Sequence, residues 1–164
     1  MIVAVGCDHA GYALKARIFR AIEEAGYEVL DCGAYAPDPD DDYPDYARAV
    51  GEALIDGRAQ RGVLLCGSGV GVAIAACKIP DVRAAMAHDT FSARQGVEDD
   101  EMNVITIGAR VIGPELAAEV VNAFLAARFS GDERHVRRSA KIDAIERDAR
   151  DGAFDRPRHD GADA

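Results

Sequence analysis

Short apolar runs, each bounded by turn residues, alternate with helical patterns along the chain. Their continuous apolar character, as in Val63, Leu64 and Leu65, is typical of parallel strands that are buried on both faces. The same character argues against an antiparallel sheet with one face in water. We therefore predict five strands, at Ile2–Gly6, Glu28–Asp31, Gly62–Cys66, Arg83–Ala87 and Val104–Gly108.

Between these runs, apolar residues repeat at helical spacing. Leu14, Ile18 and Ile22 recur every four residues and predict a first helix. Further helices are expected over Asp45–Asp56, from near Gly69, after Thr90, from Pro114, and from Ser139 to about Arg150.

The alternation predicts an α/β fold, an open five-stranded parallel sheet flanked by helices in a Rossmann-like three-layer sandwich. Residues 1–150 are expected to form this single domain. Residues 151–164, rich in Asp, Arg, Gly and Pro, are expected to be a flexible tail. Ligands of such sheets bind beyond the carboxyl ends of the strands, so chemistry is sought there.

Composition excludes several classes of function. The formal net charge of −10 argues against a surface for nucleic acid or anionic membrane. No window is apolar enough to span a membrane, and no leader precedes the first strand, so we expect a cytoplasmic protein. The four cysteines lack paired CxxC spacing, and no His, Asp and Glu set has metal-ligand spacing, so neither a disulfide nor a metal is expected.

Three segments at strand ends carry residues with chemical potential. They are Gly6–Gly11 after the first strand, Cys66–Gly71 after the third, and Asp99–Asp100 just before the fifth. We expect all three to converge on one edge of the sheet.

The glycine-rich segment indicates a site for an oxyanion. Gly67, Gly69 and Gly71 alternate between a strand and a helix, which exposes backbone N–H groups. A dinucleotide site would need G-x-G-x-x-G after the first strand. A hydrolase elbow would need a glycine two residues before Ser68, but Cys66 stands at that position.

Cys66 directly precedes this loop, where N–H groups and the helix dipole are expected to lower the pKa of its thiol. A thiolate there would serve as a base. The alternative is a small hydrophobic residue, the better interpretation for Cys7, Cys32 and Cys77. A covalent nucleophile stays open, although no Cys–His signature supports it.

A basic run stands out in the acidic chain, from Arg134 to Lys141. It is typical either of a solvated helix start or of a site for a small anion. Arg134 and Arg138 are four residues apart, so in a helix they share one face.

Four motifs occur in colinear order over roughly residues 1–150. They are Gly-Cys-Asp-His-Ala-Gly from Gly6, Asp-Tyr-Pro from Asp42, Cys-Gly-Ser-Gly-Val-Gly from Cys66 with Ala-Ala-Cys-Lys soon after, and Gly-Ala-Arg-Val-Ile-Gly from Gly108. Together they resemble the ribose-5-phosphate isomerase B and galactose-6-phosphate isomerase family.

The resemblance implies an aldose–ketose isomerase that acts on a small sugar phosphate through an enediol, without a cofactor or metal. It also implies a homodimer, often a dimer of dimers, whose active sites combine residues of two subunits. Ribose 5-phosphate is the expected substrate. A tetrulose 4-phosphate, a hexose 6-phosphate and a non-catalytic sugar-phosphate-binding subunit remain alternatives.

The resemblance further implies residue roles. Cys66 would move the proton between C2 and C1 of the sugar, while Ser68 and the N–H groups of the loop (Gly67, Gly69, Val70, Gly71) would hold the enediolate oxygens. Side chains implied to contact hydroxyls or the ring are Asp8 and Tyr43, and those implied to bind phosphate are His9, Arg110, Arg134 and Arg138.

One position departs from the family pattern. Many members carry His-Asn four residues before the asparagine that matches Asn103 and use the histidine to open the sugar ring, whereas this chain has Asp99-Asp100. In the first interpretation, Asp99 opens the ring, and Asp100 and Asn103 bind substrate. In the second, His88 reaches in from the end of the fourth strand to open the ring. In the third, the substrate arrives already open. A tetrulose 4-phosphate is always open, because its O4 carries the phosphate. The remaining interpretation is a solvated acidic loop over residues 98–101.

Overall fold

The centre of the molecule is a five-stranded sheet whose strands are all parallel, in the order β2-β1-β3-β5-β4. This computed structural model describes residues 1–155. The strands are β1 (Ile2–Cys7), β2 (Glu28–Asp31), β3 (Arg61–Cys66), β4 (Ala84–Met86) and β5 (Val104–Gly108). The predicted fold class and all five strands are confirmed, with β4 shorter than expected.

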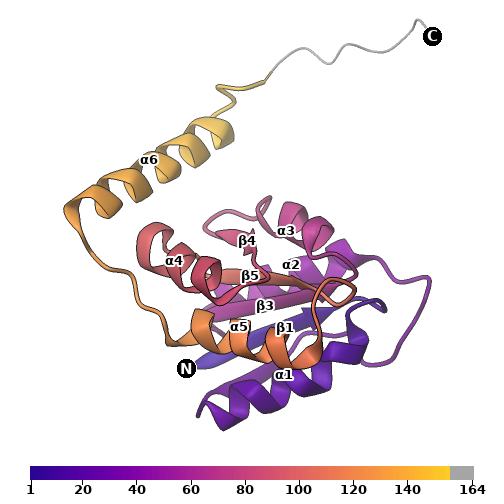
Figure 1. Cartoon of the computed structure of the whole chain (residues 1–164). Coiled ribbons are helices and arrows are strands. Elements are labelled where there is room, and N and C mark those ends of the chain that lie inside the picture. The colour runs from indigo at the N-terminus through magenta and orange to yellow at the C-terminus, as the bar shows by residue number, and fades with distance from the viewer. Residues whose placement is uncertain (156–164) are drawn as a thin grey trace, which may run out of the picture.

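Helices cover both faces of the sheet (Figure 1). Their bounds are α1 (Tyr12–Glu24), α2 (Tyr43–Ile55), α3 (Val70–Ala76), α4 (Thr90–Asp100) and α5 (Pro114–Ala126). Helices α1, α4 and α5 pack on one face, where Ile18 and Phe124 are fully buried, and α2 and α3 pack on the other, where Val50 is. Each such side chain contributes roughly 1.5–3 kcal/mol by leaving water.

The chain changes direction in the sheet at β1. It passes from β1 to β2 on one side, then returns to place β3 on the other side of β1. The loops that follow β1 and β3 therefore diverge. A crevice lies between them at the carboxyl ends of these two strands, as in other open parallel sheets. Asp8 and Cys66 stand at the two sides of this crevice.

The last helix, α6 (Glu133–Arg150), stands clear of the sheet (Figure 1). It begins six residues before the predicted start at Ser139. Its first turns carry charged side chains with little apolar periodicity, so the sequence pattern hides them. Residues 151–154 form a turn with Phe154 exposed, and the remainder of the predicted tail, residues 156–164, lies outside the described residues.

Within residues 1–155, no helix combines the length and apolar character needed to cross a bilayer.

Candidate active site

Cys66 ends β3 between the neighbouring strands β1 and β5. Its Sγ accepts a hydrogen bond from the N–H of Gly69 at 3.0 Å, and only 5% of the residue is exposed. Cys66 belongs to the cluster of buried apolar residues that contains Val72 and Leu64. The backbone N–H of Gly69 points directly at the sulfur atom.

The loop after Cys66 is shaped by two close backbone approaches. Gly69 has φ +86°, a left-handed conformation that glycine adopts without strain. A Cβ on Gly108 would lie 2.5 Å from the backbone of Ser68, so only glycine lets β5 come this near. Both glycines hold the loop tightly over the sheet.

Ser68 presents the loop's only hydroxyl. Its side chain is exposed, and Oγ accepts a hydrogen bond from the N–H of Val70 at 3.2 Å. Within the described residues, the N–H groups of Gly67 and Ser68 donate no hydrogen bond. These two donors are available to an oxyanion, whereas the predicted donors of Gly69 and Val70 are engaged within the loop.

The loop after β1 supplies a buried carboxylate on the other side of the crevice. Asp8 is 6% exposed, and its Oδ1 accepts the N–H of Gly11 at 2.8 Å. Its own N–H donates to the carbonyl of Leu65 at 3.2 Å, which joins this loop to β3. Tyr43 lies on the same rim, since a Cβ on Gly71 would come within 2.9 Å of its ring.

Two cationic side chains lie beside these groups. The Nδ1 of His9 is 2.6 Å from Oδ1 of Asp41, and this hydrogen bond raises the pKa of His9 above its ordinary value. Arg110 is exposed and crosses Gly67, where a Cβ would be 3.6 Å from its Nε. His9, which is paired with the Asp41 carboxylate, and Arg110 form a corner whose N–H groups suit phosphate oxygens.

His88 also reaches this edge from the segment after β4. Its Nε2 accepts the N–H of Gly108 at 2.9 Å, so that nitrogen carries no proton in this arrangement. The interpretation that His88 approaches the glycine loop is consistent with this contact.

The expectation that Asp99 and Asp100 meet Cys66 is wrong for a single chain. They end α4, whose last turn leads to the amino end of β5, whereas Cys66 pairs with the carboxyl end at Gly108. Four residues of β5 separate the two ends, or about 13 Å. They are also part of a helix end rather than of a solvated loop.

Asn103 lies at the same amino edge. Its Oδ1 accepts the N–H of Arg83 at 2.8 Å, and its Nδ2 donates to the carbonyl of Asp81 at 2.8 Å. The amide is therefore engaged in joining β5 to the segment before β4.

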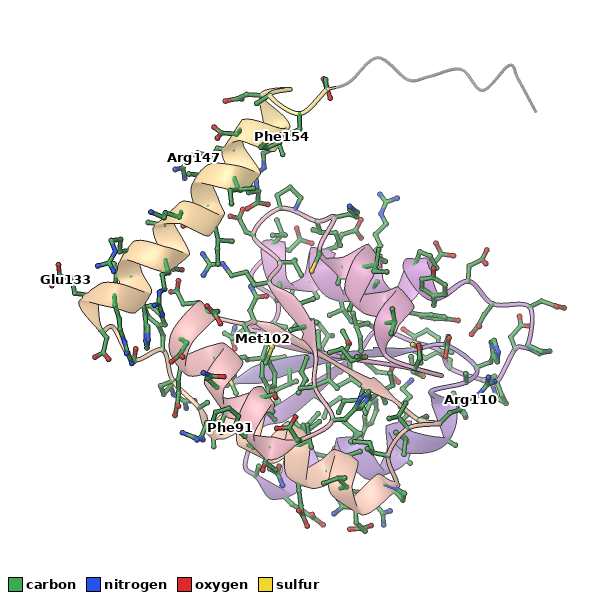
Figure 2. All side chains as sticks on the ribbon, turned by 45° about the horizontal axis from the view of Figure 1, so that its top comes forward. Phe91, Met102, Arg110, Glu133, Arg147 and Phe154 are labelled. Carbon is green, nitrogen blue, oxygen red and sulfur yellow. The ribbon has the colours of Figure 1, made fainter. Side chains whose placement is uncertain are left out.

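Arg134 and Arg138 share a face of α6, as their spacing predicts, and both are exposed. Figure 2 shows Glu133, at the start of α6, and Arg110 on opposite sides of the molecule. The chain thus separates the two groups of predicted phosphate ligands.

Asp41 was not identified from the sequence, and His135 was noted there only as part of the basic run. The Asp41 carboxylate accepts a hydrogen bond from the backbone N–H of His9 at 2.8 Å, and it also pairs with the ring of His9. Its only signal was the run of aspartates over residues 38–42, which follows β2 at the carboxyl edge. His135 is 2% exposed, and its Nδ1 lies 2.7 Å from Oγ of Ser130 and 3.4 Å from Oδ1 of Asp99.

Comparison with known proteins agrees with this arrangement. Residues 3–142 match the family described as Ribose/Galactose Isomerase. Ribose-5-phosphate isomerase B of Escherichia coli is 41% identical over 88% of this chain and 95% of that protein. D-erythrulose-4-phosphate isomerase of Pectobacterium atrosepticum is 44% identical over 79% of this chain and 85% of that protein.

Among solved structures, Clostridium thermocellum ribose-5-phosphate isomerase B superposes with a TM-score of 0.87 at 40% identity, covering 91% of this chain and 99% of that one. The fold is α/β, with a thiol, a hydroxyl and free N–H donors at one edge of a parallel sheet, and the relatives that share it are sugar-phosphate isomerases. The chain belongs to the Ribose/Galactose Isomerase family.

Proposed function

We propose that this protein interconverts ribose 5-phosphate and ribulose 5-phosphate, with Cys66 as the base. The observation that carries the proposal is the Sγ of Cys66, held by the N–H of Gly69 at 3.0 Å at the crevice edge. A base, an oxyanion loop and a cationic corner are the three things that this isomerisation needs.

Groups at the edge of the crevice can carry out each proton transfer of the reaction. The Cys66 thiolate removes the proton from C2 of the open aldose, and the C–H electron pair forms the C1=C2 double bond while O1 becomes negative. The free N–H groups of Gly67 and Ser68 would stabilise this oxygen. The Ser68 hydroxyl passes a proton from O2 to O1, and the Cys66 thiol returns its proton to C1.

His9 and Arg110 would hold the phosphate away from the reacting carbons. Binding energy gained there positions C1 and C2 against Cys66. Asp8, buried between the β1 loop and β3, and Tyr43, on the rim, would accept or donate hydrogen bonds to the sugar hydroxyls.

A second copy of the chain would complete the site. Arg134 and Arg138 are exposed on α6, and Asp99 and Asp100 lie at the far edge of the sheet. In a homodimer, or a dimer of dimers, these groups of one subunit would face the Cys66 edge of the other. All four cysteines are free thiols, which suits a cytoplasmic enzyme.

A tetrulose 4-phosphate is the second candidate substrate. The residue at the family's ring-opening position is Asp99, whose Oδ1 faces His135 and whose Oδ2 accepts a hydrogen bond from Gln95. An aspartate engaged in this way suits a substrate that needs no ring opening. The D-erythrulose-4-phosphate isomerase of Pectobacterium atrosepticum, at 44% identity, supports this candidate.

The test is a panel of aldose and ketose phosphates with four to six carbons, assayed in D₂O with a chelator present. We expect deuterium to enter the substrate carbon, with ribose 5-phosphate turned over fastest. Cys66→Ala should lower kcat by roughly 10³-fold or more, since the base is lost. Cys77→Ala, which alters an exposed thiol, should behave as wild type.

The outcomes separate the candidates. Preference for erythrulose 4-phosphate over ribose 5-phosphate would select the tetrulose reaction. Binding of sugar phosphates without deuterium exchange would identify a non-catalytic subunit, and wild-type turnover by the Cys66 variant would remove Cys66 as the base.

A further inference from the structure

Helix α6 is held to the rest of its own chain by one polar face. The contacting residues recur every three or four positions, which places them in line along the helix: His135, Ser139, Asp143, Glu146 and Arg150. His135 and Ser139 are buried, whereas Arg134 and Arg138 on the adjacent face are exposed. One face therefore attaches the helix and the other presents the arginines.

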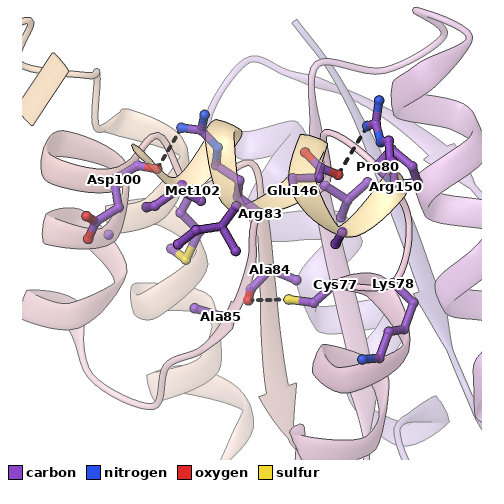
Figure 3. Close-up of a pocket in the computed structure, with 15 residues that line it drawn as sticks. Cys77, Lys78, Pro80, Arg83, Ala84, Ala85, Asp100, Met102, Glu146 and Arg150 are labelled. Atoms are coloured by element: carbon purple, nitrogen blue, oxygen red, sulfur yellow. Dashed lines mark hydrogen bonds and ion pairs between the residues drawn. The ribbon is translucent and has the colours of Figure 1, made fainter. Parts of the chain in front are cut away.

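Arg83, just before β4, is the centre of this attachment. Its Nη1 donates to Oγ of Ser139 at 2.5 Å and to Oε2 of Glu101 at 2.7 Å, and its Nη2 donates to Oδ1 of Asp143 at 2.5 Å. Ser139 also donates to Glu101. A third acceptor of Nη1 is the carbonyl of Asp100 at 3.1 Å (Figure 3). A single guanidinium thus joins α6 to the end of α4.

Apolar packing contributes little to the position of α6. Ile142 and Ile145, on the side facing β4, remain 42% and 59% exposed. A groove of about 640 Å³ separates them from Val82, Ala84 and Met102 (Figure 3). The polar contacts, with Arg83 as their hub, must then set the angle at which the helix leaves the domain.

The same contacts fix where the exposed arginines point. Arg138 is one residue from Ser139 and about 1.4 turns from Asp143 along the helix. A rotation or tilt of α6 that follows loss of Arg83 would displace both Arg134 and Arg138, because they share the helix with the anchored residues.

We propose that Arg83 is a positioning residue for phosphate binding: it sets α6 so that Arg134 and Arg138 reach the active site of a second copy. The inference rests on the proposed function. The hydrogen bonds of the Arg83 side chain go to α6 and to the end of α4, and its planar fork satisfies acceptors from these elements at once, a geometry that lysine does not reproduce.

The first test compares Arg83→Gln and Asp143→Asn with Arg147→Gln, an exposed arginine of α6, as a matched control. We expect KM for the sugar phosphate to rise about 10-fold in the first two, with kcat changed by less than about 3-fold, because a binding anchor is displaced while Cys66 is untouched. Arg83→Lys should restore only part of the loss. A wild-type KM in both variants would overturn the inference.

A double-mutant cycle tests whether Arg83 acts through the arginines. In an Arg134→Gln/Arg138→Gln background, Arg83→Gln should add less than about 2-fold to KM, since the groups it positions are already gone. A further 10-fold rise would show that Arg83 acts by another route.

Amide hydrogen exchange separates this inference from the proposed function. Faster exchange across residues 133–150 in Arg83→Gln, with unchanged exchange in β3 and β5, is the expected result and needs no turnover. If the wild-type enzyme isomerises no sugar phosphate, the proposed function fails while this readout still measures the anchor. If turnover is present and the exchange of α6 is unchanged, the positioning inference alone fails.

Discussion

At the scale of single residues, the same type of side chain has different roles according to its surroundings, as two of the cysteines show. Cys7 is fully buried, and burial raises the pKa of its thiol to about 11, so it stays protonated and acts as a core residue. Cys66 is also buried, but its Sγ accepts the N–H of Gly69. Its place at a glycine-rich strand end distinguishes the proposed base from the structural cysteines.

The pairing of His9 with Asp41 makes substrate binding depend on pH. The hydrogen bond to Asp41 raises the pKa of His9, so the imidazolium persists to higher pH than for an unpaired histidine, whose pKa is about 6.5. The charge is present below the folded-state pKa and is lost as pH rises through it. Binding of a phosphate by His9 should weaken over that same range.

Asp41→Asn tests this dependence. The substitution should lower the pKa of His9, so that KM begins to rise at lower pH than in the wild type, by about 3- to 10-fold where the two protonation states differ most. KM from pH 5.5 to 9 and an NMR titration of His9 measure it, and the ratio between variants cancels the substrate's own ionisation. Identical pH profiles would contradict the assignment.

At the scale of elements, the strands were predictable and the ends of helices less so. A strand buried on both faces is expected to be a nearly continuous apolar run, so Val63 to Leu65 could be recognised, and so could Val104 to Ile107 with Thr106 as its one polar residue. The start of α6 was missed because its attached face is polar, with His135 and Ser139 buried by hydrogen bonds that no hydrophobic pattern records.

The candidate site was predictable only where it is local in sequence. The loop from Cys66 to Gly71 is one continuous segment, so its glycine pattern is visible in the sequence. The structure brings this loop beside Asp8 and Arg110. Asp99 was misplaced because helices between parallel strands run back across the sheet, so a residue just before a strand lies at the amino edge. The pairing of Asp41 with His9 joins residues 32 positions apart, which spacing does not reveal.

The approach of β5 to the glycine loop leads to a prediction for Gly108. In Gly108→Ala the new Cβ would lie 2.5 Å from the backbone of Ser68, so the loop must shift. We expect a loss of about 1–3 kcal/mol in the free energy of unfolding. The displaced Ser68 should lower kcat about 10- to 100-fold. Urea unfolding and steady-state kinetics measure the two effects.

Gly113→Ala is the matched control, because no atom lies within 4 Å of its Cβ position and its φ is −77°. Its only expected cost is the weaker preference for alanine at a helix N-cap, below about 1 kcal/mol, with normal turnover. Equal effects of the two substitutions would show that the close approach to Ser68 does not matter.

At the scale of the whole molecule, the predicted phosphate ligands lie at two places in a chain of net charge −10. One is the corner of His9 and Arg110, and the other is the exposed face of α6 with Arg134 and Arg138. A doubly charged phosphate is bound best where both meet, and the extended position of α6 keeps them apart within one chain (Figure 1). In the proposed two-fold dimer the two places would meet twice, once at each active site.

Mixing two inactive variants tests this shared architecture. Cys66→Ala keeps the arginines of α6, and Arg134→Ala/Arg138→Ala keeps the thiol, so a mixed dimer contains one site with every group intact and one that lacks both. After unfolding and refolding equal amounts together, half of the dimers should be mixed, which restores roughly a quarter of the wild-type activity at low substrate concentration. Each variant refolded alone measures the background. If the mixture is no more active than the average of the two, each active site is built within one chain, and α6 must swing back to its own Cys66 edge.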